Sequence, residues 1–315
     1  MERILVVRGG AIGDFVLTLP ALKLLRDAFP DAWIEILGYK HIVALVENRF
    51  YAQAVRSLES GQLARFFAKG AELPPDMSAY FGKVDLVLSY LFDPDKIFEE
   101  NVRRCGVEKF LAASPKITGP AHAARHLARP LVELGLQLNE PAAILYPSAA
   151  DQETAARVLR RLAAPIVALH PGSGSETKNW PIKRWLQLAE WLLRSKYAAS
   201  LLVIAGEADR QQLDLFRAVA ESDGIRLVEN LPLPELAAVF QNCTCFIGHD
   251  SGISHIAAAV ATPSVLLFGP TDPAVWAPQN HNVRVLRGPG KDLTQLPCDV
   301  VAGTVQELMR IGIRT

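Results

Sequence analysis

The stretch IVALHPGSGSETKNWPIKRWLQLAEWLLRS, residues 166–195, holds one complete strand–loop–helix unit. It begins with a short apolar run, Ile166–His170, that has the composition of a buried strand. A polar loop rich in glycine and serine follows, and the helical pattern Lys183–Ser195 comes after it. Buried strands that alternate with helices are typical of parallel sheets covered by helices on both faces. The stretch therefore predicts an α/β fold.

The same alternation continues along the chain in two sets. Each expected strand is a short run of branched apolar residues that ends at glycine or a polar position. The first set has expected strands at Ile4–Val7, Trp33–Leu37 and Val84–Ser89 and helices at Phe15–Ala28, Ile42–Asn48 and Ala121–Gly135. The second set adds strands at Leu201–Ala205, Cys245–Gly248 and Val265–Phe268 and helices at Arg210–Glu221, Pro234–Gln241 and Ser254–Val260. Two sets predict two doubly wound domains.

Length and a break in the pattern indicate where one domain ends. A chain of 315 residues is long for one domain and suits two of about 150. The stretch Leu138–Ala150 contains Pro141 and Pro147 and lacks clear periodicity, so we expect the linker there. The predicted domains are residues 1–145 and 151–315. Because doubly wound domains bind ligands at the carboxyl ends of their strands, we expect a site in a cleft between them.

Composition excludes several classes of protein. The 33 lysines and arginines equal the 33 aspartates and glutamates, which excludes a generally basic nucleic-acid binder. The longest apolar run, Ile256–Phe268, is interrupted by Pro263 and is too short to cross a bilayer. The N-terminus enters a strand directly and lacks the layout of a signal peptide. We therefore expect a soluble, cytoplasmic protein.

The cysteines give no sign of a metal centre. Their spacing matches neither a zinc site nor a disulfide framework. In a reducing compartment such residues are buried small hydrophobic side chains, and this is what we expect of all four. They are Cys105, Cys243, Cys245 and Cys298.

The loop after the first expected strand, Arg8–Asp14, combines glycines with one carboxylate. Glycines allow a tight turn and the close approach of a ligand to the backbone. Asp14 starts the next helix, where a carboxylate caps the helix or complements its dipole. Asp14 can instead face the cleft as a general base, and both interpretations stay open. The G-x-G-x-x-G spacing of dinucleotide-binding folds is absent, which disfavours a nicotinamide-dependent oxidoreductase.

The loop after Ile166–His170 has the composition of a phosphate site. Ser173, Gly174 and Ser175 expose backbone N–H groups, and Lys178 follows within reach of a bound anion. The segment is no P-loop, because no G-K-[ST] closes it. A polar loop with a solvated lysine is an equally good interpretation.

A second phosphate site is indicated between Cys245–Gly248 and the following helix. Asp250, Ser251, Gly252 and His255 gather at that helix N-terminus, where free N–H groups and the helix dipole favour an anion. A capping turn needs only one such residue, so the crowding favours ligand binding over a structural histidine. After the last strong strand, Thr271 either lines the cleft or belongs to a plain turn.

Together the two phosphate sites and Asp14 indicate a transferase with a diphosphate-linked donor, and the segments resemble glycosyltransferase family 9, the ADP-heptose:lipopolysaccharide heptosyltransferases. The opening pattern of that family is matched by Arg8, Gly13, Asp14, Pro20 and Leu25-Arg26. Its donor loop, Lys-x-Trp-Pro, is matched by Lys178, Trp180 and Pro181. Its Asp-[Ser/Thr]-Gly-x-x-His signature is matched by Asp250, Ser251, Gly252 and His255, followed by Pro263 and Phe268–Thr271.

The resemblance implies a GT-B fold, in which two Rossmann-like domains face a central cleft. The N-terminal domain would bind the acceptor and the C-terminal domain the nucleotide sugar. The implied reaction is an inverting, metal-independent transfer of a heptose from ADP-heptose to a lipopolysaccharide core or similar glycan, with no cofactor. By the same resemblance Asp14 is the catalytic base and Lys178 holds the diphosphate. The implied donor-binding residues are Gly13, Ser173, Gly174, Ser175, Asp250, Ser251, Gly252, His255 and Thr271, with Glu207 or Asp209 on the ribose.

A phosphorylated glycolipid acceptor needs a local basic surface, because the net charge is zero. Lys116, Arg125 and Arg129 form part of the best basic cluster, and the two arginines lie one helical turn apart. A solvated helix face is the alternative interpretation. We expect membrane contact to be peripheral, through the lipid of the acceptor, at the cytoplasmic face of the inner membrane.

Two other functions stay open at this point. Some GT-B enzymes epimerise or hydrolyse sugar nucleotides without a sugar acceptor, and release of free sugar would identify such an enzyme. A non-catalytic nucleotide-sugar-binding module would contain the same loops. Asp14 disfavours the module, because binding alone needs no carboxylate there.

Overall fold

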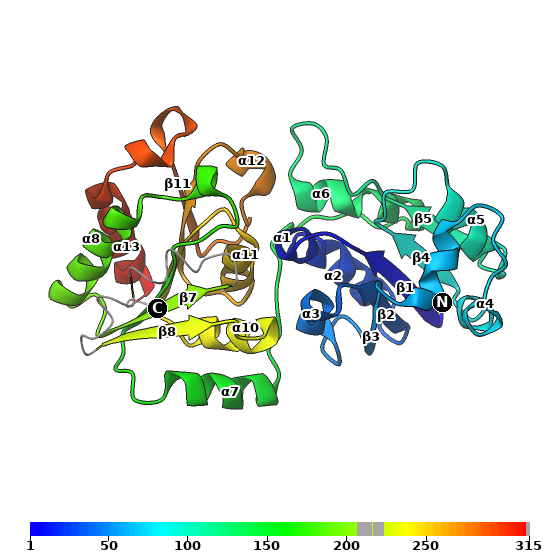
Figure 1. Cartoon of the computed structure of the whole chain (residues 1–315), viewed down its shortest axis with the longest axis horizontal. Coiled ribbons are helices and arrows are strands. Elements are labelled where there is room, and N and C mark those ends of the chain that lie inside the picture. The colour runs from blue at the N-terminus through cyan, green and yellow to red at the C-terminus, as the bar shows by residue number, and fades with distance from the viewer. Residues whose placement is uncertain (207–215, 217–223, 313–315) are drawn as a thin grey trace. The chain divides into compact units, whose positions relative to one another are not determined.

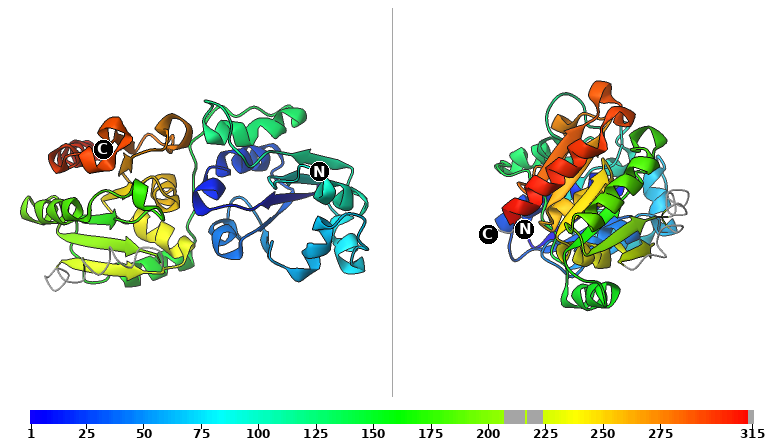
Figure 2. Two further views of the ribbon diagram at one scale, coloured as in Figure 1. Left: turned by 45° about the horizontal axis from the view of Figure 1, so that its top comes forward. Right: turned by 90° about the vertical axis from the view of Figure 1, so that its left-hand side faces the viewer.

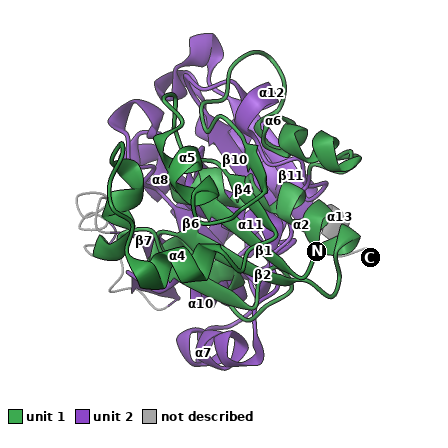
Figure 3. Cartoon of the chain, turned by 90° about the vertical axis from the view of Figure 1, so that its right-hand side faces the viewer, with its two compact units in different colours: residues 1–141 green, residues 142–315 purple. Residues whose placement is uncertain are grey.

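The computed structural model describes residues 1–206, 216 and 224–312. The chain divides into two compact units, Met1–Pro141 and Ala142–Thr315, each coloured separately in Figure 3. The sequence-based boundaries, 145 and 151, lie a few residues later. The physical reason is that the segment after Pro141 is hydrogen-bonded to the second unit: Leu145 N donates to Ala259 O at 2.9 Å, and Asn280 Nδ2 donates to Ala143 O at 2.8 Å.

Unit 1 is built on a five-stranded sheet in the order β3-β2-β1-β4-β5, and every neighbouring pair is parallel. Strand β1 lies in the middle and is paired on both sides, so the side chains of its apolar run, Ile4–Val7, are buried on both faces. The strands are β1 (Arg3–Arg8), β2 (Trp33–Gly38), β3 (Ala54–Ser57), β4 (Leu86–Ser89) and β5 (Lys109–Ala112), labelled in Figure 1.

Helices pack against this sheet through alternate side chains of its strands. Leu5 and Val87 share one apolar cluster with Phe66, Phe81 and Phe98, which come from three different helical segments. The α-helices are α1 (Ile12–Val16), α2 (Leu19–Ala28), α3 (Lys40–Val43), α4 (Pro75–Phe81), α5 (Ile97–Arg103) and α6 (Ala123–Ala128). The 3₁₀ segments are η1 (Ala44–Val46), η2 (Gly61–Phe67) and η3 (Arg129–Leu134).

Unit 2 is built on a six-stranded parallel sheet in the order β11-β10-β9-β6-β7-β8. Three neighbours, β10, β9 and β6, form its middle, and the loops at their carboxyl ends therefore meet at one edge of the sheet. The strands are β6 (Ile166–His170), β7 (Ser200–Ala205), β8 (Ile225–Glu229), β9 (Cys245–His249), β10 (Ser264–Phe268) and β11 (Val283–Arg287).

The helices of unit 2 cover its sheet in two groups. One group, α8 and α13, shares a core with the strands through Trp185, Leu188, Val301 and Val305, and Figure 2 shows α13 in red beside the sheet. In the other group, α10 contacts both α7 and α11. In the described part of unit 2 the α-helices are α7 (Ala149–Leu159), α8 (Ile182–Arg194), α10 (Leu233–Gln241), α11 (Gly252–Ala259), α12 (Pro273–Trp276) and α13 (Cys298–Gly312). The 3₁₀ segments are η4 (Glu176–Lys178), η6 (Pro289–Lys291) and η7 (Leu293–Gln295).

The strands missing from the sequence-based prediction are β3, β5, β8 and β11, which are the outer strands of the two sheets. Each contains at least one lysine, arginine or glutamate, because an outer strand is buried less completely than a central one. The charged residues interrupt the apolar run that marks a central strand. The predicted helix at Arg210–Glu221 lies outside the described residues, apart from Phe216.

Two predicted helices are each divided at a proline. The expected helix Phe15–Ala28 is two helices, α1 and α2, and Pro20 lies in the first turn of α2. The expected helix Ala121–Gly135 is α6 followed by η3, with Pro130 in the first turn of η3. Proline has no N–H to donate to the preceding turn and is tolerated only at the start of a helix, so a single helix was the wrong prediction.

The four cysteines are free thiols. Cys243 and Cys245 are buried, and burial raises the pKa of both thiols to about 12. Cys105 and Cys298 are half-buried. Among the described residues, no helix has the length and apolar character that a membrane crossing requires.

Arg26 anchors the end of α2 in unit 1. Its guanidinium is buried and donates five hydrogen bonds, including one to Ala32 O at 2.7 Å and one to Gln53 Oε1 at 2.8 Å. We expect Arg26→Met to lower the free energy of unfolding by about 3 kcal/mol, because buried carbonyl groups lose their donor. Urea unfolding followed by circular dichroism measures the change. Arg194→Met, at an exposed position of α8, is the control and should change stability by less than about 0.5 kcal/mol.

Candidate functional site

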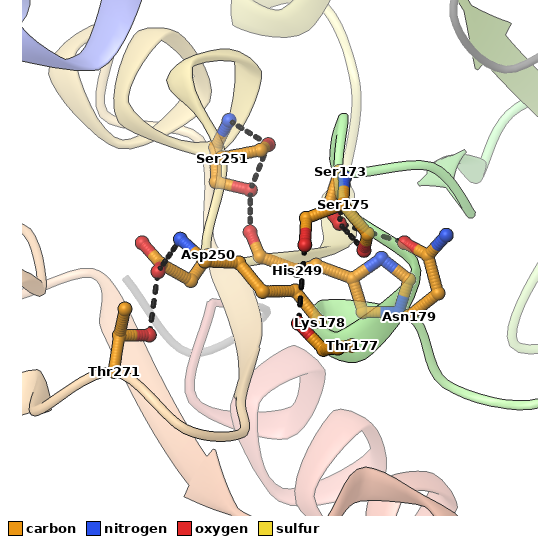
Figure 4. A network of polar contacts seen from close by, with 10 residues as sticks. Ser173, Ser175, Thr177, Lys178, Asn179, His249, Asp250, Ser251 and Thr271 are labelled. Carbon is orange, nitrogen blue, oxygen red and sulfur yellow. Dashed lines mark hydrogen bonds and ion pairs between the residues drawn. The ribbon is translucent and has the colours of Figure 1, made fainter.

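Three loops of unit 2 meet at the carboxyl ends of β6, β9 and β10. Lys178, from the loop after β6, places Nζ 2.6 Å from Asp250 Oδ2, and Asp250 directly follows β9. Thr271, from the loop after β10, donates its hydroxyl to the same carboxylate oxygen at 2.6 Å. The structure thus brings together three predicted site residues that are far apart in sequence, as Figure 4 shows.

The exposure of this cluster is uneven. The Lys178 side chain is 28% exposed, whereas that of Asp250 is 9% exposed. The carboxylate is therefore held inside the unit, and the ammonium group is the part of the pair that solvent or a ligand can reach. A half-buried ammonium group is a point charge with three donors and suits a phosphate oxygen.

The loop that carries Lys178 is held together by its own hydroxyl groups. Ser173 Oγ lies 2.7 Å from Asn179 Oδ1 and 2.9 Å from Ser175 O, and Ser175 Oγ lies 3.1 Å from Thr177 Oγ1. Gly174 has a φ of 73°, a conformation that glycine adopts at little cost. These contacts fix the two ends of the loop relative to each other, and with them the position of Lys178. Asn179 was not predicted as a site residue, and the only sign of it in the sequence was its place beside Lys178 in the loop.

Ser251 is the N-cap residue of α11, and Gly252 is the first residue of the helix. The Ser251 hydroxyl accepts a hydrogen bond from Ser254 N at 3.4 Å and lies 3.5 Å from His170 Nδ1. The N–H groups of a first helical turn have no partner within the helix, so this end of α11 can receive an anion beside Lys178. His255 lies on α11 and is 5% exposed, which places it largely inside the unit.

His249 is a residue of this region that the sequence-based site did not include. It is fully buried at the end of β9, where its Nε2 accepts a hydrogen bond from Trp180 N at 2.8 Å. Its Nδ1 lies 3.2 Å from Gly172 O and therefore donates to that carbonyl in the neutral ring. His249, the residue directly before Asp250, thus connects both ends of the Lys178 loop to the end of β9. His249 directly precedes the predicted Asp-Ser-Gly-x-x-His signature. Its hydrogen-bond partners, Trp180 and Gly172, are distant in sequence and are revealed only by the tertiary structure.

Removing this link should destabilise unit 2. We expect His249→Phe to lower the free energy of unfolding by about 2 kcal/mol, because Trp180 N and Gly172 O lose their partner in a buried place while the ring volume is kept. Urea unfolding measures the change. The matched control is His281→Phe at an exposed position, and an equal loss in both variants would contradict the role of His249.

In unit 1, Asp14 lies in α1 after the glycine-rich loop that follows β1. Its Oδ2 accepts a hydrogen bond from Ala11 N at 3.0 Å, so one carboxylate oxygen caps the helix. The side chain is nevertheless 35% exposed. A Cβ at Gly10 would lie 2.8 Å from Asp14 Oδ2, and Gly10 has a φ of 97°, so this position requires glycine. Gly13 lies on the same short helix.

The basic residues predicted for the acceptor are exposed but differ in their contacts. Arg125 on α6 donates to Leu138 O at 3.0 Å and to Asn139 O at 3.2 Å, so its guanidinium holds the chain near the end of unit 1. Arg129 begins η3, and Lys116 lies in the loop before α6. The two predicted ribose contacts, Glu207 and Asp209, lie outside the described residues. Among the residues that are described, no three His, Cys, Asp or Glu side chains are grouped as a metal site would need.

Comparison with known proteins identifies the family. The model of glycosyltransferase family 9 (heptosyltransferase) matches residues 118–299, more than half of the chain. This chain belongs to glycosyltransferase family 9. Its resemblance to that family, inferred from the motifs, is confirmed, and the protein is a glycosyltransferase.

Individual members of the family differ in how much of the chain they match. Lipopolysaccharide heptosyltransferase 1 of Escherichia coli is 24% identical over 97% of both chains. Lipooligosaccharide heptosyltransferase 2 of Haemophilus influenzae is 34% identical, but over only 39% of this chain and 36% of its own. The solved structure of E. coli ADP-heptose lps heptosyltransferase II covers 99% of both chains with a TM-score of 0.79 at 17% identity. These neighbours confirm the predicted GT-B fold of two Rossmann-like domains.

Proposed function

We propose that this family 9 glycosyltransferase moves a heptose from ADP-heptose to a lipopolysaccharide core or a similar phosphorylated glycolipid. The donor is suggested by the ADP-heptose named for the solved structural neighbour, and the acceptor by the lipopolysaccharide enzymes among the relatives. The observation that carries the proposal is the meeting of Lys178, Asp250 and Thr271 beside the N-terminus of α11. This cluster has the charge and donors that a nucleotide diphosphate needs.

The donor diphosphate binds, in this proposal, between the Lys178 loop and the first turn of α11. Lys178 supplies the positive charge, and the backbone of Ser173, Gly174, Ser251 and Gly252 supplies N–H donors, whereas Ser175 N donates to Ser173 Oγ within the loop. Thr271 holds the carboxylate of Asp250, which orients the lysine. His255 and Gly13 stay assigned to the donor as predictions. As the sugar leaves, negative charge grows on the diphosphate, and a lysine fixed beforehand stabilises it without a metal ion.

Asp14 is proposed as the general base. The acceptor hydroxyl is a weak nucleophile, and a carboxylate that takes its proton during attack on the anomeric carbon makes it a stronger one. The Asp14 side chain is 35% exposed, so its carboxylate is accessible to an acceptor hydroxyl, as this role requires. A single displacement of this kind inverts the configuration at the anomeric carbon.

The acceptor is proposed to contact the basic surface of unit 1. Exposed Lys116, Arg125 and Arg129 would attract the phosphates of a glycolipid, with Arg125 contributing less because its guanidinium already holds two carbonyl groups. Such an acceptor would bring the enzyme to the cytoplasmic face of the membrane by peripheral contact.

A donor screen tests this function. We expect ADP-heptose to raise the melting temperature of the protein by several degrees, whereas UDP-, GDP- and TDP-sugars at equal concentration raise it less. Incubation with ADP-heptose and a heptose-deficient lipopolysaccharide should yield ADP and an elongated glycan of inverted configuration, also in the presence of EDTA. Preference for another nucleotide, loss of activity in EDTA, or release of free heptose without an acceptor would contradict the corresponding part of the proposal.

A further inference from the structure

The two oxygens of the Asp14 carboxylate have different surroundings. Oδ2 accepts the hydrogen bond from Ala11 N at 3.0 Å. Oδ1 lies 3.9 Å from Arg8 Nη2, which is too long for a hydrogen bond. Oδ2 is therefore held by the helix, while Oδ1 accepts no hydrogen bond from the part of the chain that the structure describes and has the Arg8 charge nearby.

Arg8 holds the main chain of Asp14 rather than its carboxylate. Arg8 Nη2 donates to Asp14 O at 3.0 Å, and Arg8 Nε donates to Thr18 Oγ1 at 3.0 Å. The Thr18 hydroxyl in turn donates to Asp14 O at 2.8 Å. Two donors thus converge on one carbonyl oxygen, in a place where Arg8 is 3% exposed and Thr18 fully buried.

The arrangement differs from an ordinary arginine–carboxylate pair. A guanidinium that binds both carboxylate oxygens through two parallel hydrogen bonds occupies the lone pairs a base needs. Here the Arg8 guanidinium donates its hydrogen bonds to the Asp14 carbonyl and the Thr18 hydroxyl. It acts on Oδ1 of Asp14 through its charge, without a hydrogen bond. The guanidinium lies 5.6 Å from the centroid of the Tyr90 ring, and the Tyr90 hydroxyl donates to Leu127 O at 2.9 Å. The negative charge that faces Arg8 is therefore that of the Asp14 carboxylate.

We propose that Arg8 and Thr18 are positioning residues that fix the main chain of Asp14 so that Oδ1 is the oxygen that accepts the acceptor proton. The inference rests on the proposed function of Asp14 as the base. In the step, the acceptor O–H bond breaks and its proton moves to Oδ1. The acceptor oxygen forms a bond to the anomeric carbon, and the bond from that carbon to the diphosphate breaks with its electron pair on the leaving oxygen.

Thr18→Val tests the proposal, because valine has the shape of threonine without the hydroxyl. We expect kcat to fall about tenfold or more while the KM for the donor changes less than about twofold, since the base is misplaced and the donor loops are untouched. Thr18→Ser restores the hydroxyl and should recover kcat to within about threefold of the native enzyme.

Thr262→Val is the matched control. Thr262 is also a buried threonine, and its hydroxyl donates to Phe240 O at 2.7 Å in unit 2. The Thr262→Val variant should show a decrease in melting temperature similar to that of Thr18→Val, but its kcat should be that of the native enzyme. An equal loss of kcat in both variants would show that Thr18 matters only for folding and would overturn the inference.

A double-mutant cycle separates this inference from the proposed function. If Thr18 acts through Asp14, Thr18→Val causes no further loss of kcat in the Asp14→Asn background. A full additional loss there would overturn the inference. Full activity of Asp14→Asn alone would overturn the base role itself. An inactive Asp14→Asn together with an unaffected Thr18→Val would overturn the positioning role and leave the base role standing.

Discussion

Asp14→Asn is expected to lower the rate of transfer by about 10²–10⁴-fold, the usual contribution of a general base. Asparagine keeps the size of the side chain and can still accept from Ala11 N through its carbonyl oxygen, so the cap of α1 is preserved. What it loses is the ability to take a proton. Binding of ADP to the variant, measured by calorimetry, should stay within about twofold of the native protein, because Lys178 and the α11 loop belong to unit 2.

The control for this prediction is Asp27→Asn. Asp27 is an exposed carboxylate on α2 of the same unit, paired with Lys23 at 2.5 Å. Its loss removes one surface ion pair and should leave transfer unchanged. The base role would be refuted by an Asp14→Asn enzyme that transfers at the native rate, or by two variants that lose activity equally.

Lys178→Gln is expected to have the second large effect. Glutamine removes the charge that would neutralise the donor diphosphate, both in the bound state and as the leaving group departs. We expect ADP to bind at least about tenfold more weakly and transfer to fall about 10²–10³-fold. The Asp250 carboxylate then loses its ion pair and keeps the hydrogen bond from Thr271 in a nearly buried position, so a lower melting temperature is expected as well.

Lys183→Gln is the matched control for Lys178. Lys183 is an exposed lysine five residues later, on α8. Its substitution by glutamine removes the same charge from the same unit. Calorimetry with ADP and the transfer assay on both variants measure the difference. Equal losses would mean that net charge, rather than the position of Lys178, governs donor binding.

The central strands of both sheets could be predicted from the sequence because their apolar character is local. Ile166–His170 was predicted with the bounds that β6 has in the structure, and Val265–Phe268 within one residue of β10. The loops after these strands were predicted from their glycines and hydroxyl residues, which exist in the sequence whatever the fold. The outer strands and the breaks at Pro20 and Pro130 depend on exposure and on hydrogen bonding, which a run of residue types expresses poorly.

By itself the sequence determined the class of fold, the family and which loops carry polar chemistry, since each depends on residues close together along the chain. Only the tertiary structure decided which of those residues meet. Asp250 is 72 residues from Lys178 and 21 from Thr271, and it contacts both because β10, β9 and β6 are neighbours in one sheet. The tertiary structure likewise decides the hydrogen-bond partners of His249. It also decides that Asp14 Oδ2 accepts a hydrogen bond from Ala11 N while Oδ1 does not bond to Arg8. A hydrogen bond forms between groups that are close in space, whatever their separation along the chain. The order of the strands in the sheet decides which loops, and therefore which of these groups, are close.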